Sequence, residues 1–256
     1  MVIHAVKVPR ERIEPLRREF LAATRFQLRY FAVHERGCSD SYLMLADGLE
    51  AGFGSIKGQE IPDRDTVFEF FVRPAFADSA REMFAELLRA SQVAYIECQS
   101  NDELLTSLLL EFGRNIRSDV VLFEDHATTN LVVAGASVRR RRPDEAMFDH
   151  HGEPEGDYVV DVEGTIVASG GFLLHYNPPF ADLYMETRAD ARRRGYASLL
   201  LQDVKKACYE AGRVPAARTS LGNYGSRAAL TKAGMRICGF MLLADVMTSP
   251  LPEATV

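Results

Sequence analysis

A short basic turn, Arg192-Arg193-Arg194-Gly195-Tyr196-Ala197, stands between two segments of different hydrophobic period. Residues 180–187 before it have the apolar character of a strand, and residues 198–207 after it have the spacing of an amphipathic helix. A strand that passes through a glycine-containing turn into a helix leaves free backbone N–H groups at the helix N-terminus, where anions such as pyrophosphate bind. The turn therefore predicts an α/β unit with an anion site.

Strand and helix patterns alternate along the whole chain, which is typical of a mixed α/β fold. In the first half they predict a helix over 10–35, strands over 41–45, 51–56, 66–72 and 93–98, helices over 79–88 and 102–112, and a strand over 120–123. In the second half they predict strands over 158–162, 165–176, 180–187, 216–219 and 238–243, and helices over 194–211 and 224–233.

The two halves look like diverged copies of one unit. Asn101 and Asn223 each precede a helix, and these helices end in the glycine-containing tripeptides 111–113 and 232–234. The alternative is that any two α/β units share this order of elements. We expect a tandem repeat whose boundary lies in the polar stretch 126–130.

Charge and composition narrow the classes of function. A formal net charge of −6 argues against a nucleic-acid or anionic membrane surface. No stretch approaches the roughly 18 apolar residues that span a bilayer, and the N-terminus lacks the apolar run of a signal peptide. The cysteines are far apart, which predicts reduced thiols: Cys38, Cys98, Cys208 and Cys238. We therefore expect a soluble, cytoplasmic protein that binds neither nucleic acid nor membrane.

The basic turn and a second motif together resemble the GNAT acetyltransferase superfamily. The pattern R-x-x-G-x-A at 192–197 is similar to its acyl-CoA pyrophosphate loop, Q/R-x-x-G-x-G/A. Downstream, residues 223–226 and 232–235 resemble its second signature, N-x-x-S followed by K-x-G-F, with Met in place of Phe. The segment 138–145 resembles the opening strand and the Asp that follows it. The resemblance covers 138–246, and the first half weakly, and implies two GNAT-like acyltransferase domains in tandem, each with a mixed sheet flanked by helices.

Three departures from the family pattern bear on function. Leu230 stands where the family often has a Tyr that protonates the leaving thiolate. Only residues 145–156 are available for the two helices that help to wall the acceptor site. The first copy has Ala75–Arg81 in place of the pyrophosphate loop, without a Gly and with an Asp that would repel phosphate. We therefore predict that 1–127 form a degenerate, acceptor-side domain and that 128–256 form the domain that binds acyl-CoA.

By this resemblance the turn and its flanks bind acetyl-CoA. Backbone N–H groups would hold the pyrophosphate, and Gly195 permits its close approach because it has no Cβ. The alternative, a solvated basic turn, is disfavoured by the helix dipole unless an anion is present. Asn223 would bond the pantetheine arm, or act only as a helix cap. The residues expected to bind the cofactor are Met185, Thr187, Arg192, Arg193, Arg194, Gly195, Tyr196, Ala197, Ser198, Asn223 and Ser226.

Acyl transfer needs a base for the acceptor amine and a donor that polarises the thioester carbonyl. The resemblance places that donor in the backbone of 185–187. Glu186 is the first candidate for the base, and its alternative role is a strand-end carboxylate paired with an arginine. Tyr184 lies on the same strand face and is an equally plausible apolar wall. Tyr224, Tyr196 or a water could replace the missing acid.

The sequence thus predicts an N-acetyltransferase that transfers an acetyl group from acetyl-CoA to an amine of a small molecule or peptide, as a monomer or homodimer. Two alternatives stay open: an acyl-CoA-binding regulatory protein that has lost transfer, which Leu230 favours, and an acyltransferase with a longer acyl or an aminoacyl donor. The run Asp149–His151 lies in a polar loop, so we expect no metal site there. His175 is expected to be an ordinary hairpin histidine rather than a base.

Overall fold

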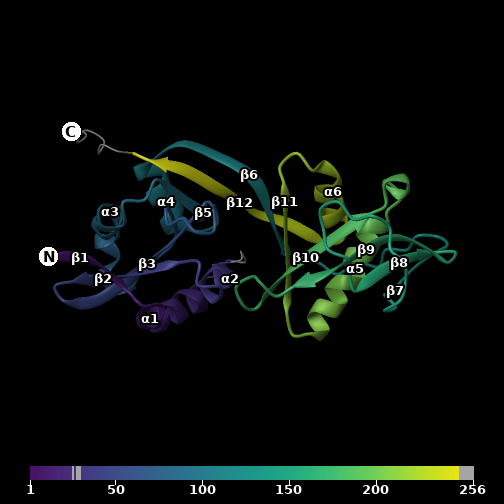
Figure 1. Ribbon diagram of the computed structural model, residues 1–256, viewed down its shortest axis with the longest axis horizontal. Coiled ribbons are helices and arrows are strands. Elements are labelled where there is room, and N and C mark those ends of the chain that lie inside the picture. The colour runs from purple at the N-terminus through teal and green to yellow at the C-terminus, as the bar shows by residue number, and fades with distance from the viewer. Residues whose placement is uncertain (25, 27–29, 248–256) are drawn as a thin grey trace. The chain divides into compact units, whose positions relative to one another are not determined.

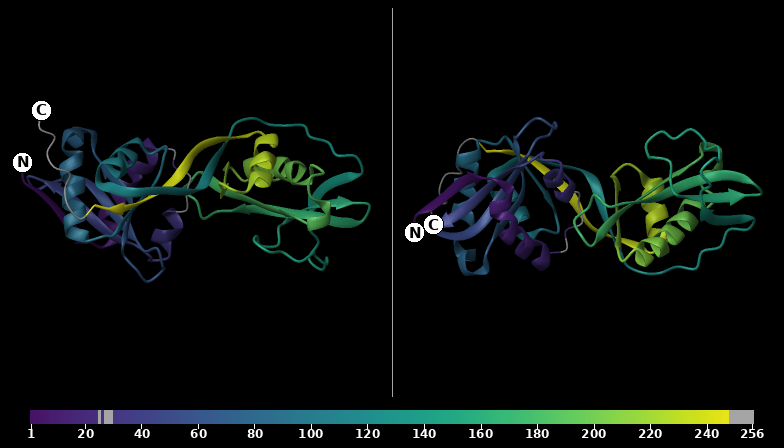
Figure 2. Two further views of the ribbon diagram at one scale, coloured as in Figure 1. Left: turned by 90° about the horizontal axis from the view of Figure 1, so that it is seen from above. Right: turned by 60° about the horizontal axis from the view of Figure 1, so that its bottom comes forward.

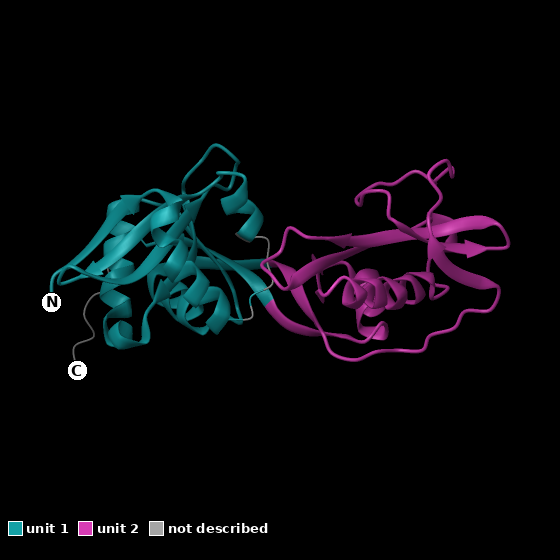
Figure 3. Ribbon diagram, turned by 90° about the horizontal axis from the view of Figure 1, so that it is seen from below, with its two compact units in different colours: residues 1–118, 240–256 teal, residues 119–239 magenta. Residues whose placement is uncertain are grey.

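The structure, a computed structural model, describes residues 1–24, 26 and 30–247 of the 256-residue chain. The chain divides into two compact units: unit 1 comprises residues 1–118 and 240–256, and unit 2 comprises residues 119–239 (Figure 3). Each unit is a mixed β-sheet flanked by helices, which confirms the predicted fold class (Figure 1). Among the described residues no helix is both long enough and apolar enough to cross a membrane.

Unit 1 carries helices on both faces of its sheet. Its elements are β1 (Ile3–Val8), α1 (Arg10–Ala23), α2 (Tyr30–Glu35), β2 (Asp40–Ala46), β3 (Leu49–Lys57), β4 (Thr66–Val72), the 3-10 helix η1 (Pro74–Ser79), α3 (Ala80–Ser91), β5 (Tyr95–Gln99), α4 (Glu103–Phe112) and the start of β6 (Gly113–Asp125). The strands lie in the order β1-β2-β3-β4-β5, and residues 241–245 of β12 (Met235–Val246) pair with β5.

Each face of the unit 1 sheet has its own apolar core. Ile13, Leu16 and Phe20 recur at helical spacing on α1 and pack against Leu43 and Phe53 of the sheet. On the opposite face α3 and α4 bury a larger cluster, which includes Met83, Phe84, Leu87, Leu105, Leu108 and Leu109. A sheet covered on both faces explains why β4 is apolar along nearly its whole length.

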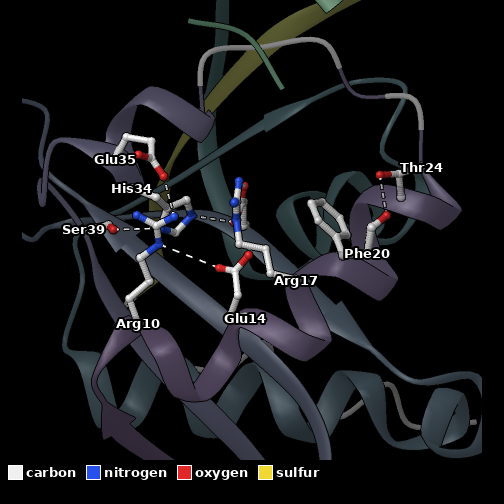
Figure 4. A network of polar contacts seen from close by, with 9 residues as sticks. Arg10, Glu14, Arg17, Phe20, Thr24, His34, Glu35 and Ser39 are labelled. Atoms are coloured by element: carbon white, nitrogen blue, oxygen red, sulfur yellow. Dashed lines mark hydrogen bonds and ion pairs between the residues drawn. The ribbon is translucent and has the colours of Figure 1, made fainter. Parts of the chain in front are cut away.

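Beneath α1 the carboxylate of Glu69, on β4, is buried among polar partners. Arg17 donates two hydrogen bonds to it, at 3.1 and 3.2 Å, and His34 Nε2 lies 2.8 Å from its Oε2. His34 Nδ1 lies 2.9 Å from the hydroxyl of Ser39 (Figure 4). Burial alone would raise the pKa of Glu69, but His34 and Arg17 outweigh it and lower the pKa to about 2. An ionised Glu69 thus joins α1 and α2 to the sheet.

We expect Glu69→Ala to destabilise unit 1 by about 3–5 kcal/mol, because it removes the buried carboxylate to which Arg17 and His34 are bound. The matched control is Glu50→Ala, which breaks the exposed pair with Arg12 and should cost about 0–1 kcal/mol. Urea unfolding followed by circular dichroism measures both, since the chain has no Trp. A loss under about 1 kcal/mol for Glu69→Ala, within the range of exposed pairs, would contradict a stabilising role.

Unit 2 carries its helices on one face of the sheet only. Its elements are β7 (Ala136–Arg140), β8 (Tyr158–Val162), β9 (Thr165–Leu173), β10 (Phe180–Thr187), the 3-10 helix η2 (Ala189–Ala191), α5 (Tyr196–Glu210), β11 (Val214–Ser220) and α6 (Tyr224–Lys232). The strands lie in the order β7-β8-β9-β10-β11, and residues 120–124 of β6 pair with β11. α5 packs along the centre of this sheet and buries Leu199, Leu200 and Val204 (Figure 2).

The other face of the unit 2 sheet meets the loop 141–157, which contains neither helix nor strand. Arg139 holds the start of this loop through ion pairs with Glu145 and, at 2.8 Å, with Asp161. Arg141 pairs with Glu155 at 2.8 Å. The expectation that the second copy lacks the two helices over 145–156 is confirmed.

The compact units do not coincide with the predicted domains, 1–127 and 128–256. The chain leaves unit 1 after residue 118 and returns to it at residue 240. β6 starts in unit 1, but its residues 119–125 belong to unit 2, whereas 240–246 of β12 belong to unit 1. Each unit therefore completes its sheet with a strand segment from the other half of the chain. Hydrophobic patterns identify a strand but not its partner, so this exchange could not be predicted from the sequence.

For the N-terminal region one prediction is wrong and one strand was missed. The expected helix over 10–35 is two helices, because Thr24 adopts an extended backbone (φ −120°, ψ 161°) and its hydroxyl donates to the carbonyl of Phe20 at 2.7 Å. Residues 25 and 27–29 of that expected helix lie outside the described part of the chain. The strand β1 was not expected at all, and it pairs antiparallel with β2.

Candidate functional site

The strands β10 and β11 of unit 2 part from each other halfway along their length. They pair in parallel from Phe180–Val214 to Asp182–Ala216. Beyond that point β10 stays paired with β9 as far as Thr187, and β11 stays paired with β6 as far as Ser220. A cavity of about 300 Å³ opens where the two strands separate.

The cavity reaches both faces of the sheet. On the helix face it is lined by Leu183, Met185, Leu201, Ala217, Thr219, Asn223, Ser226 and Leu230. On the loop face it is lined by Tyr184, Arg218 and Glu153. Because successive residues of a strand point to opposite faces, the apolar wall belongs to the α5 side and the polar groups to the side of the loop 141–157. A long ligand on the helix face can therefore meet a second molecule through the sheet.

The basic turn follows β10 directly and has the geometry of an anion cradle. Arg193 and Gly195 have left-handed backbone angles, φ +62° and +87°, and α5 begins at Tyr196. The first N–H groups of a helix have no intrahelical acceptor, and the dipole gives that end a partial positive charge. Within the described chain, Arg192, Arg193 and Arg194 form no ion pair, so their charge is available to an anion.

Lys232 adds a further cation to this turn. Its Nζ lies 3.9 Å from the position that a Cβ on Gly195 would occupy. Val133 Cγ2 lies 3.5 Å from the same position, so both side chains border the turn at ordinary contact distance. The left-handed φ of Gly195, rather than a lack of space, favours glycine here.

Glu186 lies on the loop face of β10, and its carboxylate binds the loop backbone. The N–H groups of His151, Gly152 and Glu153 donate to it at 3.0, 3.2 and 3.3 Å. Partial burial raises the pKa of Glu186, but these bonds outweigh burial and hold the pKa below its ordinary value. These contacts make Glu186 an anchor of the loop, and its role as the base stays a prediction.

Glu153, which the sequence did not single out, lies at the mouth of the cavity. Partial shielding from water raises its pKa, and the nearby carboxylates of Asp182 and Glu186 raise it further. Arg218 acts in the opposite direction without coming within the 4.0 Å of an ion pair. No sequence pattern marks Glu153. It reaches the cavity because the carboxylate of Glu186 binds the backbone of its loop.

The other predicted site residues divide between the cavity and other places. Asn223 caps α6 by accepting from the N–H of Ser226 at 3.0 Å, and both also line the cavity. Leu230 is buried and forms part of the apolar wall. Tyr224 is 74% exposed with its ring beside an arginine, and Tyr196 is 7% exposed within the unit 2 core. Neither tyrosine is among the residues that line the cavity.

A second cavity, of about 460 Å³, lies beside Arg192, where the basic turn begins. Its lining comes from the loop, the end of β10 and the turn: Met147, Phe148, Asp149, His151, Glu186, Thr187, Arg188, Ala189 and Arg192. The hydroxyl of Thr187 is buried without a hydrogen-bond partner. His175, at the other end of β10, forms a 2.9 Å contact with Asp182.

Unit 1 repeats the strand separation but not the turn. β4 and β5 pair only at Thr66–Tyr95 and Val67–Ile96. The segment that follows β4 is η1, which starts with a proline that has no N–H and contains no glycine. The carboxylate of Glu69 occupies the sheet face that α1 covers. That unit 2 alone binds acyl-CoA stays a prediction, and these differences favour it.

Comparison with family models assigns both parts of the chain to one family. Residues 10–126 match a model described as an acetyltransferase (GNAT) domain, and residues 122–235 match one described as the acetyltransferase (GNAT) family. A search of curated proteins finds no match.

Solved structures share the fold. One is an acetyltransferase of the GNAT family from Colwellia psychrerythraea, with a TM-score of 0.73 and 13% identity over 96% of this chain and 100% of the other. Another is a tandem GNAT protein from the clavulanic acid biosynthesis pathway, with a TM-score of 0.59 and 12% identity over 97% of this chain and 100% of the other.

Proposed function

Because this chain carries two GNAT acetyltransferase domains in tandem, we propose that unit 2 binds acetyl-CoA and transfers the acetyl group to the amine of a small molecule or peptide. The observation that carries the proposal is the separation of β10 from β11 where β10 runs into the basic turn. The pyrophosphate fits the turn, and the pantetheine arm fits the apolar wall that ends at the separated strands.

The thioester carbonyl would meet the free edge of β10. Once β11 has moved away, alternate N–H groups on that edge have no strand partner, and one of them near Met185–Thr187 can donate to the oxygen that becomes negative during transfer. Fixed backbone dipoles stabilise such a charge without reorganising during the reaction.

Glu153 is the best-placed base for the acceptor amine. It lies on the loop face of the cavity, opposite the apolar wall, so it can take a proton from an amine that attacks through the opening. Its raised pKa strengthens it as a base relative to an ordinary carboxylate. Glu186 is less suited, since three N–H donors stabilise its charged form. Proton return to the thiolate would come from water, because Leu230 cannot supply it.

A thiol-release assay tests the proposal. The whole chain is mixed with acetyl-CoA and a broad panel of amines, and free CoA is measured alongside calorimetric binding of acetyl-CoA. We expect micromolar binding and release of CoA that depends on one class of amine. Tight binding without release for any amine would instead support the acyl-CoA-binding regulatory role, and failure of binding would refute the cofactor site. Faster turnover with longer acyl-CoAs would reassign the donor.

A further inference from the structure

The loop face of the unit 2 cavity presents two opposite charges that do not neutralise each other. Arg218 points from β11 to this face, and Glu153 reaches it from the loop. Both residues line the same cavity, and Arg218 acts to lower the pKa of Glu153, yet the two side chains are not within the 4.0 Å of an ion pair. Within the described chain the guanidinium of Arg218 has no hydrogen-bond or ion-pair partner.

One carboxylate on the same sheet face as Arg218 is already engaged. Asp182 pairs in register with Ala216, two residues before Arg218, so its side chain emerges on that face. It is bound to His175 at 2.9 Å. Tyr184, two residues further along β10, also lines this face of the cavity, and its ring lies against Gly171 of β9. A guanidinium that no carboxylate binds is suited to hold an anionic group from outside.

We propose that the acceptor is an amine that also carries a carboxylate, as an amino acid or a short peptide does. This rests on the acyl-transfer function proposed above. Arg218 would hold the carboxylate through paired N–H donors, and Glu153 would hold the ammonium and then remove its proton. The two recognition groups lie at the opening between β10 and β11, so the bound amine faces the thioester.

The surrounding charges favour a carboxylate over a phosphate as the anionic group. Asp182 and Glu186 both act electrostatically on Glu153, so the carboxylates on this side of the cavity penalise a dianion more than a monoanion. A planar guanidinium also matches the two oxygens of a carboxylate in geometry. Arg218 is on the sheet face opposite Asn223 and Leu201, so it does not serve the pantetheine side.

The test measures acceptor binding and transfer separately. Amino acids and dipeptides, their carboxamides, the corresponding decarboxylated amines and phosphoethanolamine are titrated into the chain loaded with CoA. We expect at least one carboxylate-bearing amine to bind 10-fold or more tightly than its carboxamide. In Arg218→Gln this preference should shrink to within twofold while the affinity for acetyl-CoA stays unchanged. Arg213→Gln, an arginine of unit 2 outside the cavity, is the matched control.

Several outcomes overturn the inference. It fails if carboxamides bind as tightly as the acids, if no carboxylate-bearing amine binds, if phosphoethanolamine alone binds, or if Arg218→Gln keeps the preference. The proposed acyl transfer fails differently, through loss of acetyl-CoA binding or absence of CoA release with every amine. Acetylation of amines that lack a carboxylate, at rates equal to those of their acids, would leave transfer standing and remove the acceptor class.

Discussion

Gly195→Glu is expected to abolish acetyl-CoA binding, with an affinity loss of at least about 100-fold, or about 3 kcal/mol at 1.4 kcal/mol per tenfold. The new side chain would project beside Val133 and Lys232, and its carboxylate would repel the pyrophosphate and compete with it for the cations of the turn. It would also neutralise the positive end of the α5 dipole toward the ligand. Isothermal calorimetry with acetyl-CoA measures the effect.

Gly212→Glu is a closely matched control at the other end of α5. Gly212 also has a left-handed backbone, φ +68°, but no atom lies within 4 Å of its Cβ position. Both substitutions strain the backbone by about 1–2 kcal/mol, so the control separates a stability loss from a binding loss. We expect Gly212→Glu to bind acetyl-CoA normally. If a folded Gly195→Glu protein keeps its affinity, the turn is not the cofactor site.

The strand, turn and helix around Gly195 are local in sequence, which is why their geometry could be predicted; that they bind the cofactor stays a prediction. A strand, a turn with one glycine and a helix specify their own geometry, and the left-handed Gly195 followed by the start of α5 matches the expectation. Asn223 behaves in the same way, since a cap needs only the N–H groups of the next turn. Such local features do not depend on the tertiary contacts of the rest of the chain.

The place of Glu153 depends on contacts that no local rule provides. Glu153 lies in a loop without regular structure, and it reaches the cavity because a carboxylate 33 residues away along the chain binds the loop backbone. The same long-range contact gives Glu186 loop partners that its position on the strand did not reveal. The strand partners of β6 and β12 could not be predicted either, because pairing with a strand that is distant in sequence leaves no periodic signal in the residues.

Glu153→Gln is expected to lower kcat by about 10²–10⁴-fold, the usual contribution of a positioned base, with acetyl-CoA affinity unchanged. The substitution keeps the shape of the side chain but removes its negative charge and its ability to accept a proton. Glu155→Gln is the matched control, because this neighbouring glutamate pairs with Arg141 at the surface and should leave kcat within about twofold. Steady-state rates with the best acceptor of the amine panel measure both.

The pH dependence of kcat/KM separates Glu153 from Glu186. A base acts only when deprotonated, so activity rises with pH through the pKa of the base. Burial and neighbouring carboxylates place the pKa of Glu153 above the ordinary glutamate value of 4.5, whereas the N–H bonds place that of Glu186 below it. We expect the acid limb above 4.5 and its disappearance in Glu153→Gln. An acid limb of the pH profile below 4.5 that disappears in Glu186→Gln would instead identify Glu186 as the base. The base would then be carried by the strand β10 and not by the loop.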